Sequence, residues 1–306
     1  MAEQKVINFM GQRKLAAVLS IVLLVGSIVS LAINGLRFGL DFTGGTQIEV
    51  GYERAADLEQ VRSKLAAAGF DKAVVVHFGS ETEVLVRLQQ GFKEGLGEEV
   101  VNALQKGSDE SIDLRRIEFV GPQVGEELRD DGGLGMLFAL AVVMVYVAMR
   151  FQVKFSVGAV AALIHDVVIV LGFFSVLGLD FDLTVLAAVL AVIGYSLNDT
   201  IVVSDRIREN FRVLRKGDSL EVINTSLSQT LGRTLITSIT TLLVLTALFL
   251  VGGELIHGFS IALMVGVLVG TYSSIYVAAN VLLTMKISKE DLMPPVKEGA
   301  ELDEMP

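Results

Sequence analysis

The sequence predicts an integral membrane protein, an all-α bundle of six membrane-spanning helices with one α+β domain inserted after the first helix. Hydrophobic residues make up 52% of the 306 positions and the mean hydropathy is +0.60, values above those of ordinary soluble proteins. Six apolar stretches approach the roughly 20 residues that a helix needs to cross a bilayer core of about 30 Å. Between the first and second stretches, strand and helix patterns alternate over residues 37–131.

The six apolar stretches define the spans in order. They cover residues 15–33, 134–149, 155–177, 183–203, 234–251 and 259–285. The second stretch is short by its apolar count, and Gly132 and Gly133 can extend it. The first stretch follows basic residues and ends near Ser-Leu-Ala at 30–32, which together resemble a cleaved signal peptide. Its apolar run exceeds the about 7–15 residues usual in such a signal, so an uncleaved membrane anchor is the favoured interpretation.

Basic residues gather in every second loop, and this pattern predicts the orientation of the chain. They are Lys5, Arg13 and Lys14, then Arg150 and Lys154, then Arg206, Arg208, Arg212, Arg215, Lys216 and Arg233, and finally Lys286, Lys289 and Lys297. The other loops are poor in basic residues and carry Asp180, Asp182 and Glu254. By the positive-inside rule, both termini then lie in the cytoplasm and the inserted domain lies outside.

The inserted domain follows a regular pattern. Strands are expected at 46–52, 72–78, 83–88 and 112–120, and helices at 55–68 and 95–106. This order, βαββαβ, is the ferredoxin-like arrangement. The chain therefore divides into 1–36 (N-terminus and first span), 37–131 (the inserted domain), 132–286 (five further spans) and 287–306 (a tail). Two prolines and several acidic residues after Lys289 predict that the tail is disordered.

Two carboxylates lie within predicted spans, where a buried charge is costly and usually has a function. Asp166 lies about eleven residues into the third span, or about 16 Å, near the bilayer centre. The neighbouring His165 points about 100° away around the helix, so the two need not act together. Asp199 lies about 24 Å into the fourth span, nearer the cytoplasmic side. Asn198 and Thr200 flank it.

Arg233, at the start of the fifth span, is a possible partner for Asp199. Thr237, Thr240 and Thr241 follow on the face of that helix that carries Arg233. An arginine side chain of about 6–7 Å pointing inward can approach the depth of Asp199. We therefore expect a buried Asp199–Arg233 pair whose partner exchange is controlled by protonation.

Each of these residues also has a purely structural interpretation. Asp199 can be a structural ion pair or a helix cap, and a protonated structural Asp166 has the same sequence signature. Arg233 alone is typical of a boundary anchor. Serine and threonine hydroxyls in membrane helices commonly bond to their own backbone, which is the default expectation for Thr246, Ser273 and Ser274. Gly266 and Gly270 predict close helix packing and nothing more.

Composition and motifs argue against several other classes of protein. The chain has no cysteine, and its three histidines lie far apart, so no metal site is expected. A net charge of −10 argues against a nucleic-acid partner. The Gly-Gly-Leu-Gly segment at 132–135 opens a predicted membrane helix and lacks the preceding strand and the following lysine that a phosphate-binding loop requires. No serine lies in a nucleophile-elbow motif. No enzyme activity and no cofactor are expected, so energy would come from an ion gradient or a partner.

Several extended motifs occur in one order along nearly the whole chain. They are FGLDFTGGT at 38–46, VGPQVG at 120–125, RF at 150–151, HDV at 165–167, NDTIVV at 198–203, DRIREN at 205–210, GRTL at 232–235 and TSITT at 237–241. In this order they resemble the SecD/SecF family of bacterial protein-export membrane proteins. The resemblance covers about residues 5–285.

The resemblance implies a function and partners. It implies a six-span chain that pairs with SecD as half of a twelve-span assembly like resistance–nodulation–division transporters, in the bacterial inner membrane with its inserted domain in the periplasm. It implies association with the SecYEG channel and YajC, and use of the proton-motive force to help export preproteins that SecA has driven in. Asp199 then matches the proton-coupling carboxylate and Arg233 its partner, while Asn198 and Asp166 match family motifs. Sodium stays open as the coupling ion, although one carboxylate without clustered carbonyls suits a proton better.

Glycines flank the inserted domain and suggest flexible joints. Gly39, Gly44, Gly45, Gly121 and Gly125 would allow the domain to tilt when the spans rearrange, although Gly44-Gly45 is also typical of a tight turn. An exposed sheet edge is then expected to accept an unfolded chain by strand addition. Two rival functions stay open: a proton-driven exporter of small molecules or lipids, and a scaffold of the channel complex that transports nothing.

Overall fold

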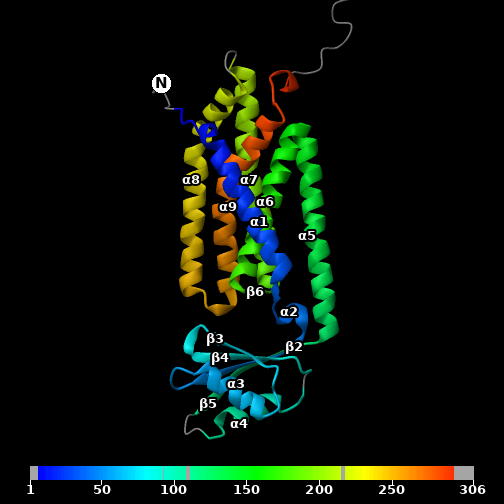
Figure 1. The fold of residues 1–306 in the computed structure, drawn as a ribbon, viewed down its shortest axis with the longest axis vertical. Coiled ribbons are helices and arrows are strands. Elements are labelled where there is room, and N and C mark those ends of the chain that lie inside the picture. Colours follow the sequence, from blue (N-terminus) through cyan, green and yellow to red (C-terminus); the bar gives the residue numbers. More distant parts are fainter. Residues whose placement is uncertain (1–5, 92, 108–110, 215–217, 293–306) are drawn as a thin grey trace, which may run out of the picture.

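The computed structural model describes residues 6–91, 93–107, 111–214 and 218–292. Lys5, Arg215, Lys216 and Lys297 of the basic pattern, and the predicted disordered tail from residue 293 onward, lie outside these ranges. Figure 1 shows a bundle of long helices with a small sheet domain at one end. The first described residues, drawn in blue, lie at the opposite end of the bundle.

Six helices in the described part of the chain are long and apolar enough to cross a membrane, as the sequence predicts. They are α1 (Arg13–Ile33), α5 (Pro122–Arg150), α6 (Val153–Leu177), α7 (Leu183–Val213), α8 (Ser219–Val251) and α9 (His257–Thr284). Helices α6, α7 and α9 form the interior, while α5 is exposed along most of its length. The outer face of such a helix is expected to meet lipid or another membrane protein.

Three of these helices extend well beyond the predicted spans. α5 begins at Pro122, α7 continues to Val213, and α8 begins at Ser219. The start of α8 is capped by Asp218, whose Oδ1 accepts the Glu221 amide at 2.8 Å. Hydropathy marks the part of a helix that suits a bilayer, whereas capping and backbone hydrogen bonds decide where it ends. The apolar runs therefore gave the correct positions of the helices but underestimated their lengths.

Close packing of the interior helices depends on small residues. A Cβ atom at Gly266 of α9 would lie 2.1 Å from Cγ2 of Val192 on α7, and one at Gly270 would lie 3.1 Å from Cβ of Ser196. The glycine spacing predicted such an approach. As a result, the polar side chains of α7 and α9 come within hydrogen-bonding distance of each other and of α6.

The sheet domain spans residues 45–120. Its elements are β2 (Gly45–Tyr52), α3 (Leu58–Ala67), β3 (Val74–Phe78), β4 (Ser80–Leu88), α4 (Leu96–Gln105) and β5 (Ile112–Val120), in the βαββαβ order that the sequence predicts. The strands are antiparallel in the order β3-β4-β2-β5. Ile48 and Val86 of the sheet pack with Leu65 of α3 and Leu104 of α4. These helices cover the face that points away from the bundle (Figure 1).

The other face of the sheet turns toward the bundle (Figure 1) and carries a row of polar side chains. Arg87 Nε donates to Gln47 Oε1 at 3.1 Å, and Gln47 Nε2 donates to Glu118 Oε2 at 3.4 Å. Glu118 also pairs with Arg116. This row of side chains ties β4, β2 and β5 together across the sheet.

A short connection joins the sheet domain to the bundle. After α1, β1 (Arg37–Phe38) pairs in parallel with β6 (Asp180–Phe181), which lies between α6 and α7, and α2 (Leu40–Thr43) follows. Phe42 stacks on Phe181 at 6.0 Å between ring centroids, and Phe38 and Phe174 meet Phe181 edge to face. An aromatic cluster therefore packs the connection, through Phe38 and Phe42, onto Phe174 and Phe181 of the bundle.

Four of the five glycines predicted to form flexible joints, all except Gly121, are closely packed here. Gly44 and Gly45 have φ angles of 65° and 122°, and both follow α2 in the turn that leads into the sheet. Gly125 lies inside α5, where a Cβ would come 2.8 Å from the Gly44 amide nitrogen. Gly39 and Gly121 precede α2 and α5 as their N-caps. The segment 121–125, predicted as a linker, is instead mostly helical, because Pro122 suits the first turn of a helix.

Asp180 joins the bundle to the sheet domain by ion pairs. Its Oδ2 lies 2.7 Å from Nη2 of Arg87 on β4, and its Oδ1 lies 3.0 Å from Nε of Arg37 on β1. The Asp180 and Arg87 side chains are 29% and 20% exposed, so water screens their pair only in part. We call Arg37, Arg87 and Asp180 the arginine–aspartate bridge.

The start of the predicted disordered tail is ordered, which corrects the prediction after Lys289. Residues Glu290–Leu292 form a short 3-10 helix, η3, with Leu292 buried. Lys154 Nζ lies 2.6 Å from Asp291 Oδ2, which also accepts the Ser288 amide at 2.8 Å. One apolar anchor and one ion pair thus hold the segment that follows α9.

Loss of the Asp291 carboxylate is expected to loosen this segment. The hydrogen bond from Lys154 lowers the Asp291 pKa below its usual 3.8, so the ion pair stabilises the segment above pH 3.8 and is lost as pH falls through the lower, folded value. At neutral pH, Asp291→Asn should weaken the segment by about 0.5–1 kcal/mol and speed hydrogen exchange at the Ser288 amide. Glu290→Gln is the matched control, and equal exchange in both variants would contradict the prediction.

Candidate functional site

Two carboxylates are buried among the interior helices. Asp166 of α6 is fully buried, and Asp199 of α7 is 9% exposed. Both lie well inside helices long enough to cross a membrane. Helix α9 packs against α6 and α7 and supplies one serine to each carboxylate, Ser273 to Asp166 and Ser274 to Asp199. We call these two carboxylates and their hydroxyl donors the paired-acid site.

Uncharged hydroxyl groups hold Asp199. Thr234 Oγ1 of α8 donates to Oδ1 at 2.7 Å, and Ser274 Oγ of α9 donates to Oδ2 at 2.6 Å. Hydroxyl groups can donate to an ionised carboxylate or accept from a protonated one. Asp199 can therefore exist in either protonation state without losing all its partners, as a group that binds and releases protons requires.

The structure does not bring Arg233 and Asp199 together. Arg233 is exposed on α8 and forms no ion pair with an acidic side chain among residues 6–91, 93–107, 111–214 and 218–292. Positions 233 and 234 differ by about 100° around the helix, so when Thr234 faces Asp199 its neighbour cannot. The partner that α8 gives Asp199 within this chain is Thr234.

The threonine face predicted on α8 exists but points outward. Thr237 and Thr240 are exposed, Thr241 is half-buried, and each donates to a carbonyl of its own helix. Thr234 and Ser238 are buried on the inward face instead. Asn198, next to Asp199 on α7, is also exposed. Polar residues of α7 and α8 are thus left uncovered on helices long enough to cross a membrane.

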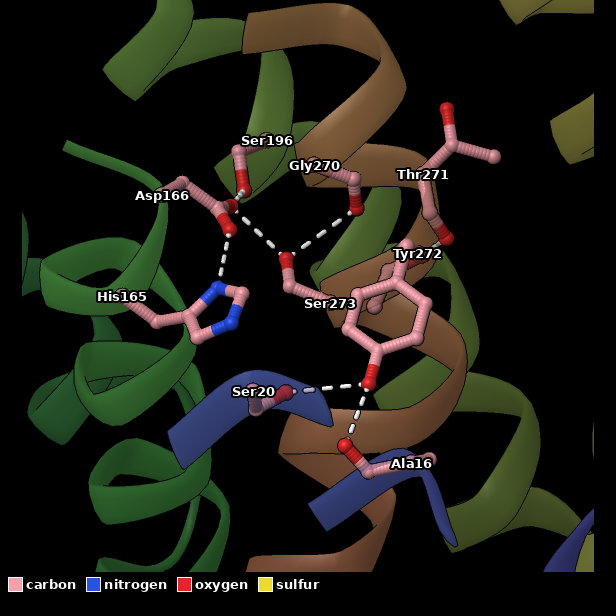
Figure 2. A network of polar contacts seen from close by, with 10 residues as sticks. Ala16, Ser20, His165, Asp166, Ser196, Gly270, Thr271, Tyr272 and Ser273 are labelled. Atoms are coloured by element: carbon pink, nitrogen blue, oxygen red, sulfur yellow. Dashed lines mark hydrogen bonds and ion pairs between the residues drawn. The ribbon is translucent and has the colours of Figure 1, made fainter. Parts of the chain in front are cut away.

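Asp166 forms a more extensive set of contacts, which Figure 2 shows. Its Oδ1 lies 2.9 Å from Nδ1 of His165. Its Oδ2 accepts from Ser196 of α7 and from Ser273 of α9, the latter at 2.7 Å. The expectation that His165 and Asp166 point apart is corrected: the Cβ atoms diverge around the helix, but the longer imidazole turns back toward its neighbour.

Four residues of the paired-acid site escaped the sequence reasoning. They are Ser196, Thr234, Ser273 and Ser274. Ser273 and Ser274 do bond to their own helix, at 3.1 Å and 3.0 Å from the carbonyls of Gly270 and Thr271, as the default expectation has it. Each hydroxyl also reaches a carboxylate. The sequence did carry a signal for them: two adjacent serines follow Gly266 and Gly270 on the packed face of α9. Neighbouring positions on a helix point in different directions, so each serine can bond to a different neighbouring helix.

No group of three or more His, Cys, Asp or Glu side chains suited to a metal ion occurs within the described ranges. The paired-acid site offers carboxylates and hydroxyls, which can bind and pass protons. It is shielded from solvent by α6, α7, α8 and α9.

Two family models match the chain. "Protein export membrane protein SecD/SecF, C-terminal" matches residues 100–288, and "SecD/SecF GG Motif" matches residues 29–56, which include Gly44 and Gly45. Among curated proteins, the chain is 54% identical to the protein translocase subunit SecF of Vibrio alginolyticus, over 99% of this chain and 98% of that protein. It is 56% identical to SecF of Pseudomonas aeruginosa, over 94% of both chains, and 44% identical to SecF of Escherichia coli O157:H7, over 97% and 94%.

Two solved structures are also similar. SecDF from Thermus thermophilus, described as a translocon-associated membrane protein, has a TM-score of 0.85 and 38% identity over 94% of this chain. SecDF in a super-membrane-facing form has a TM-score of 0.69 and 38% identity over 92% of this chain. The chain spans 39% of the length of each of those SecDF chains.

Proposed function

The chain belongs to the SecD/SecF family of protein-export membrane proteins, and on that basis we propose that it is a translocase subunit that uses the proton-motive force to promote late steps of preprotein export. The observation that carries the proposal is Asp199, a carboxylate buried inside the bundle and held, among the described residues, by hydroxyl groups from α8 and α9. Such a group can change protonation state in place, and each state favours a different arrangement of its neighbours.

We further propose that a SecD subunit covers the exposed polar faces of α7 and α8. Asn198, Arg233 and Thr237 lie uncovered within helices long enough to span a membrane, and contact with lipid would be unfavourable there. A second six-span subunit would remove these groups from lipid and form a twelve-span assembly. Arg233 would then meet Asp199, or a carboxylate of the partner, only in the complex. SecYEG, YajC and SecA-driven preproteins complete the proposed assembly.

The orientation follows from the distribution of charge. The start of α1, the end of α5 and the start of α6 lie at the end of the bundle opposite the sheet domain (Figure 1), and these helix ends carry Arg13, Lys14, Arg150 and Lys154. This supports an inner-membrane protein with cytoplasmic termini and the sheet domain in the periplasm. The strand order β3-β4-β2-β5 and the helices on one face support a ferredoxin-like domain. We propose that this domain tilts about the connection at Gly39, Gly44 and Gly45 when the bundle changes state.

The proposed coupling ion is the proton. Each carboxylate of the paired-acid site has hydroxyl neighbours, whereas a sodium site would need several more oxygen ligands around the ion. Sodium is the second candidate, because hydroxyl groups can also bind it. A scaffold role and proton-driven export of small molecules or lipids are the alternative functions. A scaffold would not require two buried carboxylates that both bind α9. A small-molecule exporter would need a wide apolar pocket in its outer domain, and residues 37–131 leave little volume for one.

The proposal is tested by preprotein export into inverted membrane vesicles. Vesicles that contain SecYEG and SecD, with and without this chain, would receive an imposed proton or sodium gradient once SecA has begun translocation. The chain should accelerate completion of export only when a proton gradient is present. Equal export with and without a gradient would support the scaffold, and a response to sodium alone would identify sodium as the coupling ion.

A further inference from the structure

His165 holds a buried nitrogen that none of the described residues satisfies. Its ring is 2% exposed, Nδ1 contacts Asp166, and Nε2 has no hydrogen-bond partner within the described part of the chain. Buried polar atoms are nearly always paired, so an unpaired one in a membrane helix suggests a function. We infer that the His165–Asp166 pair is a second proton-binding site, with Nε2 as the atom that accepts the proton.

With Asp166 ionised, its contacts determine the tautomer of His165. One of its oxygens accepts hydrogen bonds from the hydroxyl groups of Ser196 and Ser273. The same carboxylate can only accept from His165, so Nδ1 carries the hydrogen. In the neutral ring, Nε2 then bears a free lone pair. When a proton binds there, Nδ1 keeps its hydrogen and the imidazolium lies beside the Asp166 carboxylate, which stabilises its charge.

The surroundings of the ring fit this role. Tyr272 of α9 stacks on His165 with 6.1 Å between ring centroids, and its hydroxyl donates to the Ala16 carbonyl of α1 at 2.7 Å. Ser20 Oγ of α1 lies 2.9 Å from the same hydroxyl (Figure 2). Three residues of the neighbouring helices contact the His165–Asp166 pair: Ser196 of α7, and Tyr272 and Ser273 of α9. Ser20 of α1 contacts Tyr272 on its far side. Tyr272 is the titratable group among them, and these contacts include no basic side chain.

The second site is linked to Asp199 through two helices. Ser273 binds Asp166 and the adjacent Ser274 binds Asp199, so any movement of α9 changes both contacts. Ser196 binds Asp166 and precedes Asp199 by one turn on α7. Protonation at either site changes the charge that the other site faces and the hydrogen bonds that α9 makes. Binding of protons at the two sites is therefore coupled, and the coupling is reciprocal. Only its use in export rests on the proposed function.

Nuclear magnetic resonance of ¹⁵N-histidine tests the inference on the full chain in lipid nanodiscs. The chain has three histidines, and His165→Asn assigns the His165 signals. At high pH, Nδ1 should be protonated and Nε2 bare, and on acidification Nε2 should gain a proton with a defined midpoint. Asp166→Asn should remove the preference for this tautomer. A His165 ring that keeps one protonation state between about pH 5 and pH 9, a range that brackets the usual histidine value, would overturn the inference.

The link between the sites has its own control. Asp199→Asn and Ser273→Ala should each change the proton affinity of His165, by about tenfold for the charge removed at Asp199. Ser260→Ala is the matched control, because Ser260 is buried on the same helix and donates only to the Ile256 carbonyl. Equal midpoints in Asp199→Asn and Ser260→Ala would exclude the link. The measurement needs no export, so a titrating His165 in a chain that does not respond to a gradient would contradict the proposed function alone.

Discussion

Replacement of Asp199 by asparagine is expected to abolish the acceleration of export by a proton gradient and to leave the fold intact. The amide has nearly the shape of the acid and can still hydrogen-bond to Thr234 and Ser274. It cannot bind or release a proton, so any step driven by that exchange stops. Gradient-dependent export should fall to the level of vesicles without the chain, while export driven by SecA alone stays unchanged. Full acceleration in Asp199→Asn would remove Asp199 from the coupling step.

Neighbouring substitutions separate protonation from packing. Thr234→Val and Ser274→Ala each remove one hydrogen bond to Asp199 and should give intermediate rates. Thr230→Val is the matched control for Thr234→Val, since Thr230 is buried on the same helix and its hydroxyl donates to carbonyls of that helix. Arg233→Ala should leave the stability of the isolated chain unchanged, because the side chain is exposed. If Arg233 acts through a partner subunit, the variant should fail only in the complex.

The spans and the two acids could be predicted because each has a strong local signal. Twenty apolar residues identify a membrane helix, and a carboxylate within such a run stands out against its neighbours. Which face of α8 turns inward could not be predicted. Apolar residues surround most of this helix, so its hydrophobic pattern does not distinguish Arg233 and Thr237 from Thr234 and Ser238. Tertiary packing decided this rotation, and the predicted ion pair was lost with it.

The connection between the bundle and the sheet domain also could not be predicted from the sequence. β1 and β6 are two residues long and lie about 140 positions apart, so no periodic pattern predicts that they pair. Asp180 appeared only as an acidic loop residue. Its place between Arg37 and Arg87 depends on the long-range contact itself. By contrast, the alternation of β2 and the turn before β4 gave the order of the sheet domain correctly, because those signals are local.

Loss of the arginine–aspartate bridge is expected to release the sheet domain from the bundle. Of its three side chains, only Arg87 comes from the sheet domain, and its 2.7 Å contact with Asp180 is a charge-assisted interaction. Because both side chains are partly exposed, the pair should contribute about 1–2 kcal/mol, between an exposed ion pair and a buried charged hydrogen bond. Asp180→Asn and Arg87→Gln should each widen the distribution of domain positions, and the double variant should add little to either.

Spin-label distances measure this release directly, because the chain has no native cysteine. Cysteines introduced at the exposed positions Glu98 of α4 and Val251 of α8 would carry the labels. The label distances should broaden in Asp180→Asn, and high salt should broaden them in the unmodified chain, since salt screens partly exposed charges. Arg116→Gln is the matched control, because Arg116 pairs with Glu118 within the sheet. An unchanged distribution in Asp180→Asn would mean that the aromatic cluster at Phe181 holds the domain without the bridge.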